Sequence, residues 1–248
     1  ITKYLQSDIN LYKDFVGAAV TRVLTFDKYL DAASFTRRNR LDWSSKYNEG
    51  ATWIKTQCTA DEMTYKGPYD TAAWKITDTD TSSASLLQHT GRNYGWEPGD
   101  SFTASGYFCV CPDTTTPGFH MNVVMPGREA HAYFQVDTTG SEPKLIGTTS
   151  DPAFVNNVQS ELVDVDGNRY WFRCSFTTSM LTAGNVQWRV WVNERSSHSR
   201  LGSLVVAGAQ LELGTHPSKY QYTTTTHQPF ADANQVFRSQ LYKVIQKS

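Results

Sequence analysis

The residue pattern that most constrains the fold is a two-residue alternation inside short segments that end at turn signals. Successive side chains of a strand point to opposite faces, so alternation marks a half-buried strand. In the stretch NRYWFRCSFT, one face collects the apolar residues Tyr170, Phe172, Cys174 and Phe176. Similar segments recur from residue 49 to residue 225, between clusters of Gly, Pro, Asn and Asp. The pattern predicts an all-β protein, a jelly-roll β-sandwich.

The expected strands share β-branched and aromatic residues and a length of five to eleven residues. They are TWIKTQC, AAWKITD, SFTASGYFCVC, HMNVVMP, HAYFQVD, PKLIGTT, ELVDV, RYWFRCSFT, NVQWRVWVN and SLVVAGAQLEL. The dipeptide Asp166-Gly167 between ELVDV and NRYWF is a strong hairpin signal. DVDGN also resembles the start of an EF-hand loop, but it lacks that loop's later glycine and glutamate, so we expect a hairpin turn.

Charge and hydropathy argue against two classes of partner. The 23 Lys and Arg residues nearly balance the 24 Asp and Glu residues, for a net charge of −1. Nucleic-acid binding needs a basic surface, so we expect none. No apolar run approaches the roughly 20 residues of a membrane-spanning helix, so we expect no membrane insertion.

The cysteines and histidines do not show the spacing of a metal site or a catalytic motif. Cys109 and Cys111 share one face of a strand, which does not suit a disulfide between them. We expect Cys58, Cys109, Cys111 and Cys174 to be reduced and structural, in a protein assembled in a reducing cytosol. We also expect no metal and no cofactor.

Both ends of the chain differ from the strand-rich centre. Residues 1–48 carry apolar residues at helical spacing from Ile9 to Val23, and we assign them to an N-terminal anchoring or oligomerisation segment. Residues 226–248 space apolar residues by three or four from Phe230 to Ile245, which predicts a C-terminal amphipathic helix. The sandwich is expected between them, over residues 49–225.

Four stretches carry a family resemblance in the same order along the chain. They are TQCTADEMTYKGPYDTAAWKITDTD, HTGRNYGWEPGDSFTASGYFCV, GNRYWFRCSFTTS and GAQLELGTHPSKYQYTTTT. With them, residues 50–225 resemble the carbohydrate-binding-module-like β-sandwich of bacteriophage tail-fibre and appendage proteins. In such a sandwich GAQLEL is the closing strand. Leu211 and Leu213 then face the core, while Gln210, Glu212 and the following turn lead the chain to the surface.

The resemblance implies a virion structural protein, a tail or head fibre or appendage subunit without enzymatic activity. It would be assembled in the host bacterial cytoplasm, reside in the virion, and contact other virion proteins and host cell-surface glycans.

A second, polar face of two predicted strands forms the candidate glycan site. In NVQWRVWVN, core residues alternate with a polar set that contains one tryptophan, and RYWFRCSFT repeats the arrangement. Sugars pack their CH faces on indole rings and bond their hydroxyls to polar neighbours. If the two strands pair, one surface carries Trp171, Arg173, Gln187, Arg189, Trp191 and Asn193. The stretch HAYFQVD would add His131, Tyr133, Gln135 and Asp137.

Two alternatives remain open. The first is a purely architectural capsid or tail decoration protein. Tryptophan and arginine are also enriched at protein interfaces, and in this alternative a terminal segment or a neighbouring subunit covers Trp171 and Trp191. A jelly-roll polysaccharide hydrolase or lyase would instead need two carboxylates roughly 5–10 Å apart. Its candidates are Asp100, Asp113, Glu129, Asp137, Glu161 and Glu194.

We predict that the protein is a homo-oligomer, with a trimer favoured. The apolar stripes at 9–23 and 230–245 lie outside the predicted sandwich and need partners, and fibre proteins commonly provide these by cyclic symmetry. Light scattering at micromolar concentration should give a mass well above that of one chain. A monodisperse monomer would contradict the prediction.

Overall fold

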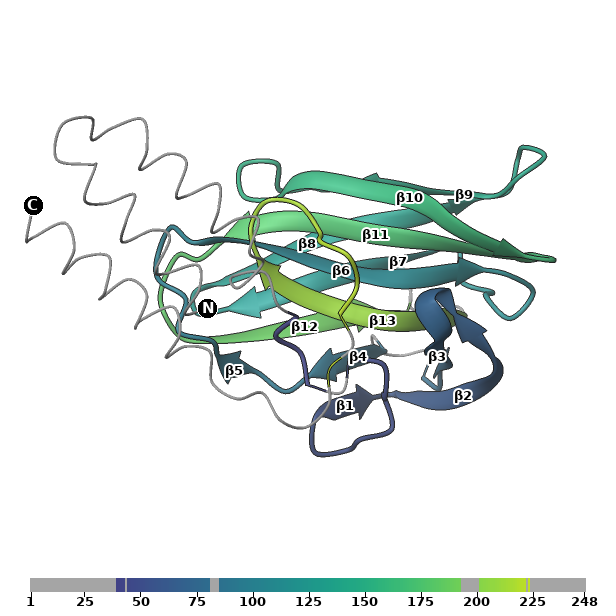
Figure 1. The fold of residues 1–248 in the computed structure, drawn as a ribbon, viewed down its shortest axis with the longest axis horizontal. Helices are drawn as coiled ribbons and strands as arrows, with labels where there is room; N and C mark the ends of the chain where they lie inside the picture. The colour runs from purple at the N-terminus through teal and green to yellow at the C-terminus, as the bar shows by residue number, and fades with distance from the viewer. Residues whose placement is uncertain (1–38, 43, 81–84, 193–200, 222, 224–248) are drawn as a thin grey trace, which may run out of the picture. The chain divides into compact units, whose positions relative to one another are not determined.

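Antiparallel pairing organises the protein into two β-sheets that pack face to face, as seen in a computed structural model (Figure 1). The structure describes residues 39–42, 44–80, 85–192, 201–221 and 223. The predicted all-β sandwich is confirmed. No helical segment in these ranges is long and apolar enough to cross a bilayer. The predicted C-terminal helix and residues 1–38 of the predicted N-terminal segment lie outside the described residues.

The first sheet, sheet A, has seven strands in the order β1-β4-β12-β7-β8-β9, with β5 paired to β12. Its strands are β1 (Trp53–Thr56), β4 (Leu86–His89), β5 (Arg92–Asn93), β7 (Gly118–Met125), β8 (Arg128–Asp137), β9 (Lys144–Thr148) and β12 (Asn185–Trp191). The short strands β4 and β5 were not among the predicted segments.

The second sheet, sheet B, has six strands in the order β10-β11-β6-β13-β3-β2. Its strands are β2 (Cys58–Gly67), β3 (Thr71–Asp78), β6 (Ser101–Val110), β10 (Asn156–Asp166), β11 (Arg169–Ser179) and β13 (Ser203–Leu213). The predicted hairpin between β10 and β11 is confirmed. Asp166 lies opposite Arg169, and Gly167 takes the positive φ of 62° that the tight turn requires.

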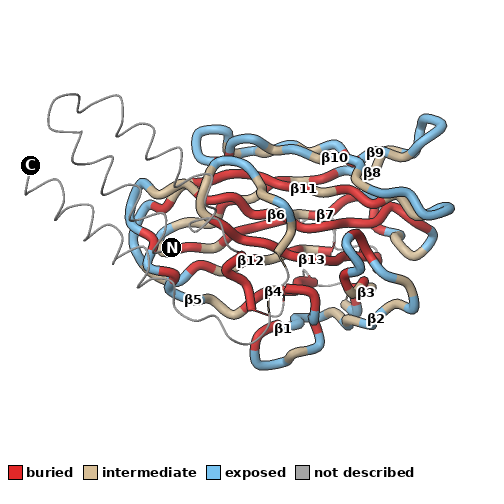
Figure 2. Tube along the Cα trace, in the orientation of Figure 1, coloured by how far each residue is buried: buried red, intermediate tan, exposed pale blue. Residues whose placement is uncertain are grey.

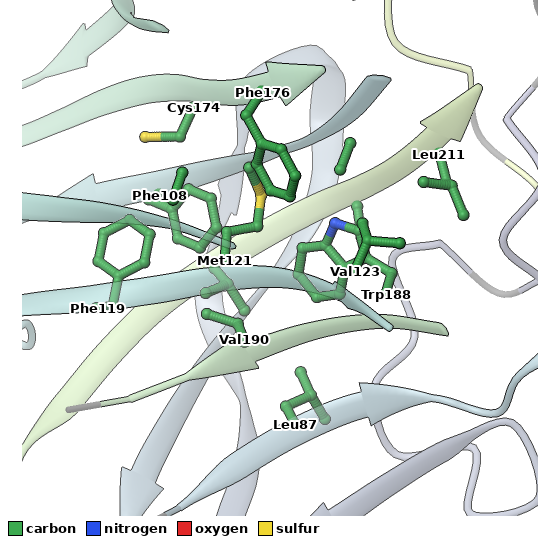
Figure 3. Close-up of a cluster of buried hydrophobic side chains, with 14 of the residues drawn as sticks. Leu87, Phe108, Phe119, Met121, Val123, Cys174, Phe176, Trp188, Val190 and Leu211 are labelled. Atoms are coloured by element: carbon green, nitrogen blue, oxygen red, sulfur yellow. The ribbon is translucent and has the colours of Figure 1, made fainter. Parts of the chain in front are cut away.

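The core lies between the inner faces of the two sheets (Figure 3). Phe108 of sheet B stacks on Phe119 of sheet A, with ring centroids 4.2 Å apart. Trp188 of β12 and Phe176 of β11 belong to the same buried cluster, so consecutive strands of the chain meet across the core. Figure 2 shows that the central strands β6, β7 and β13 are largely buried, whereas β10 is largely exposed.

The described residues before β1 pack against the sandwich, although the sequence pattern assigned them to the N-terminal segment. Leu41 and Tyr47 belong to the buried core. The Asn39 side chain donates from Nδ2 to the carbonyl of Ala209 at 2.8 Å and accepts the backbone N–H of Leu211 at 3.1 Å. These bonds attach the segment directly to the closing strand β13.

The closing strand differs from the expectation at its polar positions. Leu211 is buried in the core, as expected. Gln210 and Glu212 do not lead the chain to the surface, because both are 0% exposed. The chain turns back after β13 and covers them: Ser218 donates its backbone N–H (2.7 Å) and hydroxyl (2.6 Å) to the Glu212 carboxylate, and the Gln221 N–H bonds to the Gln210 side chain at 2.9 Å.

We predict that the Cys174 thiol is inaccessible in the native protein. The side chain is 0% exposed, and burial raises the pKa of its thiol well above the ordinary value, so little reactive thiolate forms at neutral pH. A thiol reagent should label Cys174 only after unfolding in urea. Cys174→Ser should lower the free energy of unfolding by about 1–3 kcal/mol if the buried hydroxyl finds no partner. Rapid native-state labelling of Cys174 would refute the prediction.

Candidate functional site

The six residues predicted as one glycan-binding face do not come together. β11 pairs with β10 and β6 in sheet B, whereas β12 pairs with β4, β5 and β7 in sheet A. The predicted pairing of β11 with β12 is therefore wrong. Two strands with the same alternation can also pack their apolar faces against each other across a core, and their polar faces then point in opposite directions. Asn193 lies outside the described residues.

Trp171 is a structural residue on the outer side of sheet B. It is 1% exposed and belongs to a second buried cluster with Tyr107. Met63 and Tyr65 of β2 pack against this cluster. A Cβ placed on Gly67 would lie 3.3 Å from the indole, so the end of β2 runs directly over this ring. The chain itself covers the indole, rather than the neighbouring subunit or terminal segment considered above.

Arg173 lies on the same outer face of sheet B and is partly buried. Its Nη2 donates to the Ser105 hydroxyl at 3.3 Å, and its guanidinium lies 5.7 Å from the centre of the Tyr107 ring. Farther along this face, the Thr103 and Thr177 hydroxyls donate hydrogen bonds to backbone carbonyls of the chain that returns after β13. The acceptors are the carbonyls of residues 214 and 215. Much of the outer face of sheet B is thus closed by the protein's own chain.

The other three described residues of the predicted site lie together on the outer face of sheet A. Gln187, Arg189 and Trp191 alternate along β12 and are each partly buried. Between them Trp188 and Val190 are buried in the core. The alternation read from NVQWRVWVN therefore gave the correct face for every described residue of this strand.

Strand register extends this face into an aromatic row. Trp191 lies opposite His120 on β7, and His120 lies opposite Tyr133 on β8. The His120 and Tyr133 ring centroids are 4.9 Å apart. Neighbouring strands are about 4.8 Å apart, so the three positions cover roughly 10 Å across the sheet. Tyr133 was expected from HAYFQVD. His120 was missed, although the alternation in HMNVVM places it on the other face of the strand from the buried Met121 and Val123.

A second row of polar residues runs beside the aromatic row. Arg189 lies opposite Asn122, and Asn122 lies opposite His131. The Asn122 Nδ2 donates to Glu129 Oε1 at 2.6 Å, which fixes that carboxylate. His131 Nε2 lies 3.0 Å from the Ser150 hydroxyl. We term the two rows the sheet A platform, which consists of Trp191, His120, Tyr133, Arg189, Gln187, Asn122, Glu129 and His131.

Arg189 supplies a cation to the platform, which also contains the Glu129 carboxylate. Burial lowers the pKa of its guanidinium, and the nearby Glu129 carboxylate opposes this shift. An arginine remains protonated at neutral pH even with a lowered pKa, because its ordinary value is so high. The platform therefore places a cation beside an aromatic row.

The described residues offer neither a metal site nor, at this platform, the carboxylate pair that the hydrolase or lyase alternative requires. No group of three His, Cys, Asp or Glu residues within them could hold a metal ion. Glu129 and Asp137 lie on one face of β8 eight residues apart, or roughly 27 Å along the strand. That separation is too large for a glycosidase pair. Asp113 bonds to Lys75 and Tyr65 near the end of β6, in sheet B. Glu194 lies outside the described residues.

Comparisons with known proteins concern the fold. No protein-family model matches the chain, and no curated protein matches its sequence. The enzymatically active domain of tailspike protein 4 of bacteriophage CBA120 is 11% identical, with a TM-score of 0.41 over 71% of this chain. The match spans only 21% of the tailspike chain, and a match to an exo-beta-agarase spans 26% of that chain.

Two neighbours are matched over nearly their whole length. The mannan-recognising carbohydrate-binding module TmCBM27 is 12% identical, with a TM-score of 0.36 over 73% of this chain and 97% of its own. A module specific for non-crystalline cellulose, CBM28, is 11% identical, with a TM-score of 0.35 over 71% of this chain and 96% of its own. At these identities and scores, the likeness extends to a β-sandwich fold alone.

We predict that Trp171→Ala destabilises the fold. Removing a fully buried tryptophan leaves a cavity under β2 and should lower the free energy of unfolding by about 3–5 kcal/mol. The measurement is urea unfolding followed by circular dichroism. Leu162→Ala on β10 is the control, because Leu162 is 41% exposed and its truncation should change stability by about 0.5 kcal/mol or less. Equal midpoints for the two variants would contradict the assignment of Trp171 as a core residue.

Proposed function

We propose that the protein is a non-enzymatic glycan-binding module whose ligand lies across the sheet A platform. The observation that carries this proposal is the row of Trp191, His120 and Tyr133 across three hydrogen-bonded strands, with Arg189 in the row beside it. Aromatic rings supply stacking surface for the CH faces of sugars, and the partly exposed Arg189 and His131 of the polar row supply partners for hydroxyls. Asn122 is 1% exposed and positions the Glu129 carboxylate.

The form of the platform suits an extended chain of sugars. Its side chains come from strands rather than loops, so their positions are set by the sheet. Each ring of the aromatic row is partly buried, which restricts its rotamers before a ligand arrives and lowers the entropy lost on binding. A row of roughly 10 Å is longer than one sugar ring, so more than one sugar would contact it.

The setting we propose is an appendage of a bacteriophage virion, such as a tail or head fibre, with other virion proteins as partners. This part of the proposal rests on the resemblance of residues 50–225 to the sandwich domains of such proteins. A homo-oligomer, favoured as a trimer, would present several platforms together and raise a weak affinity for host-surface glycans through avidity.

One observation favours a second candidate, an architectural decoration protein. Ile54 of β1 lies opposite Gln88, and Ile146 of β9 lies opposite Gln135, which places both exposed isoleucines on the outer face of sheet A. Apolar residues at the two edges of this face suit burial against another protein as well as contact with a sugar.

We predict that Trp191→Ala weakens glycan binding at least about tenfold without unfolding the protein. Losing the stacking surface should remove about 1.4 kcal/mol or more of binding free energy. Trp191 is outside the core, so the unfolding midpoint should stay close to that of the parent. Binding of the 248-residue chain to a glycan array and to intact host cells gives the measurement.

Leu162→Ala again serves as the control, because it truncates an exposed side chain on the opposite sheet. Parent-like binding by Trp191→Ala would exclude the platform as the binding site. Normal folding of this variant with failed assembly of the oligomer or virion would favour the architectural candidate.

A further inference from the structure

Arg189 differs from three other arginines of the described chain in its partners. Arg92, Arg128 and Arg169 each form an ion pair with an aspartate. Within the described ranges, no carboxylate lies within 4.0 Å of the side-chain nitrogens of Arg189 or Arg173. Arg173 lies over the Tyr107 ring in sheet B, whereas Arg189 lies on the platform.

The Arg189 guanidinium is held in place but retains free hydrogen-bonding capacity. Its Nη2 donates to the Gln187 side-chain oxygen at 2.6 Å, which fixes the orientation of the group. Its Nε is buried and has no hydrogen-bond partner among the described residues, a property that it shares with the Nε of Arg128, Arg169 and Arg173. The charge of the Glu129 carboxylate raises the pKa of Arg189 against the effect of burial, and this carboxylate accepts a hydrogen bond from Asn122 Nδ2. A partly desolvated cation with an unpaired donor is costly in the absence of a ligand.

The position of Arg189 relative to the aromatic row defines where an anion would bind. Arg189 and Trp191 are two residues apart on one face of β12, or about 7 Å along the strand. A sugar stacked on Trp191 therefore places its own substituents, or those of the next sugar, over the guanidinium. A planar guanidinium matches a carboxylate through two parallel N–H···O bonds, which a neutral hydroxyl cannot reproduce.

We propose that the glycan bound by the sheet A platform is acidic, and that Arg189 binds the carboxylate of a uronic acid. The inference rests on the proposed glycan-binding function and names its substrate class. Trp191 provides the stacking surface, Gln187 orients the guanidinium, and Arg189 selects the charged sugar over its neutral counterpart.

The test compares polymers that differ only in the carboxylate. Polygalacturonate, alginate and hyaluronan are each tested beside their carboxyl-reduced, neutral forms, using the 248-residue chain in affinity electrophoresis and calorimetry. The parent should bind at least one uronate polymer at least tenfold more tightly than its reduced form. Arg189→Gln should remove this preference, and Arg189→Lys should remove most of it, because lysine keeps the charge but not the planar fork.

Two controls separate this role from general charge and from folding. Arg173→Gln is the matched variant, because Arg173 is also partly buried and forms no ion pair with the described residues but lies on the opposite sheet. This variant should keep the preference for uronate polymers over their reduced forms. Dextran sulfate tests whether any anion suffices, and it should bind more weakly than the preferred uronate polymer. Unfolding midpoints of both glutamine variants verify that the native fold is retained.

The outcomes distinguish this inference from the function on which it rests. Equal binding of acidic and reduced polymers, or an unchanged preference in Arg189→Gln, would overturn the acidic-sugar inference. So would dextran sulfate binding as tightly as the uronate polymer. If neutral glycans bind and Trp191→Ala abolishes their binding, the proposed function stands while the inference fails. Binding to none of the uronate polymers overturns the inference, and absence of binding to every glycan on the array overturns both.

Discussion

Apolar packing between the two sheets is the interaction on which the rest of the structure depends. The stacked pair Phe108 and Phe119 joins sheet B to sheet A, and Trp188 lies in the same cluster. The strands of the sandwich turn one set of alternating side chains toward this layer, so the residues between them point to the outer faces. The alternation that builds the core therefore also determines which side chains are available for binding on the two outer faces.

The two outer faces differ because the chain covers one of them. Residues after β13 return across sheet B, where Ser218 bonds to the buried Glu212, and the end of β2 covers Trp171. Polar groups buried in this way find their partners within the protein, as structural groups generally do. On sheet A, Arg189 is oriented by Gln187 beside the partly buried Trp191 and has no carboxylate within ion-pair distance among the described residues. The coverage of sheet B by the protein's own chain is the physical reason for assigning a structural role to that face and a binding role to the other.

The platform owes its composition to strands that are distant in the sequence. β12 lies next to β7 although more than fifty residues separate them, and this pairing places His120 beside Trp191. Single-strand alternation shows that His120 points outward but not which residue it faces. The carboxylate of Glu129 is likewise positioned by Asn122 of the neighbouring strand. A candidate site of this kind is formed by residues that lie opposite each other on neighbouring strands. Which residues do so depends on the strand register of the whole sheet.

Local patterns in the sequence were sufficient for the fold class, the Asp166-Gly167 hairpin and the inward or outward direction of residues along β11 and β12, because a period of two acts within a few residues. They could not determine which strands pair. The same alternation in β11 and β12 fits two strands side by side in one sheet and two strands facing each other across a core, and only the packing of the complete sandwich selects the second arrangement. That arrangement buries Trp171 beneath β2 and leaves Trp191 on the outer face of the other sheet. The sequence pattern of two strands could not determine it, because the energy that separates the two arrangements comes from contacts among all the strands.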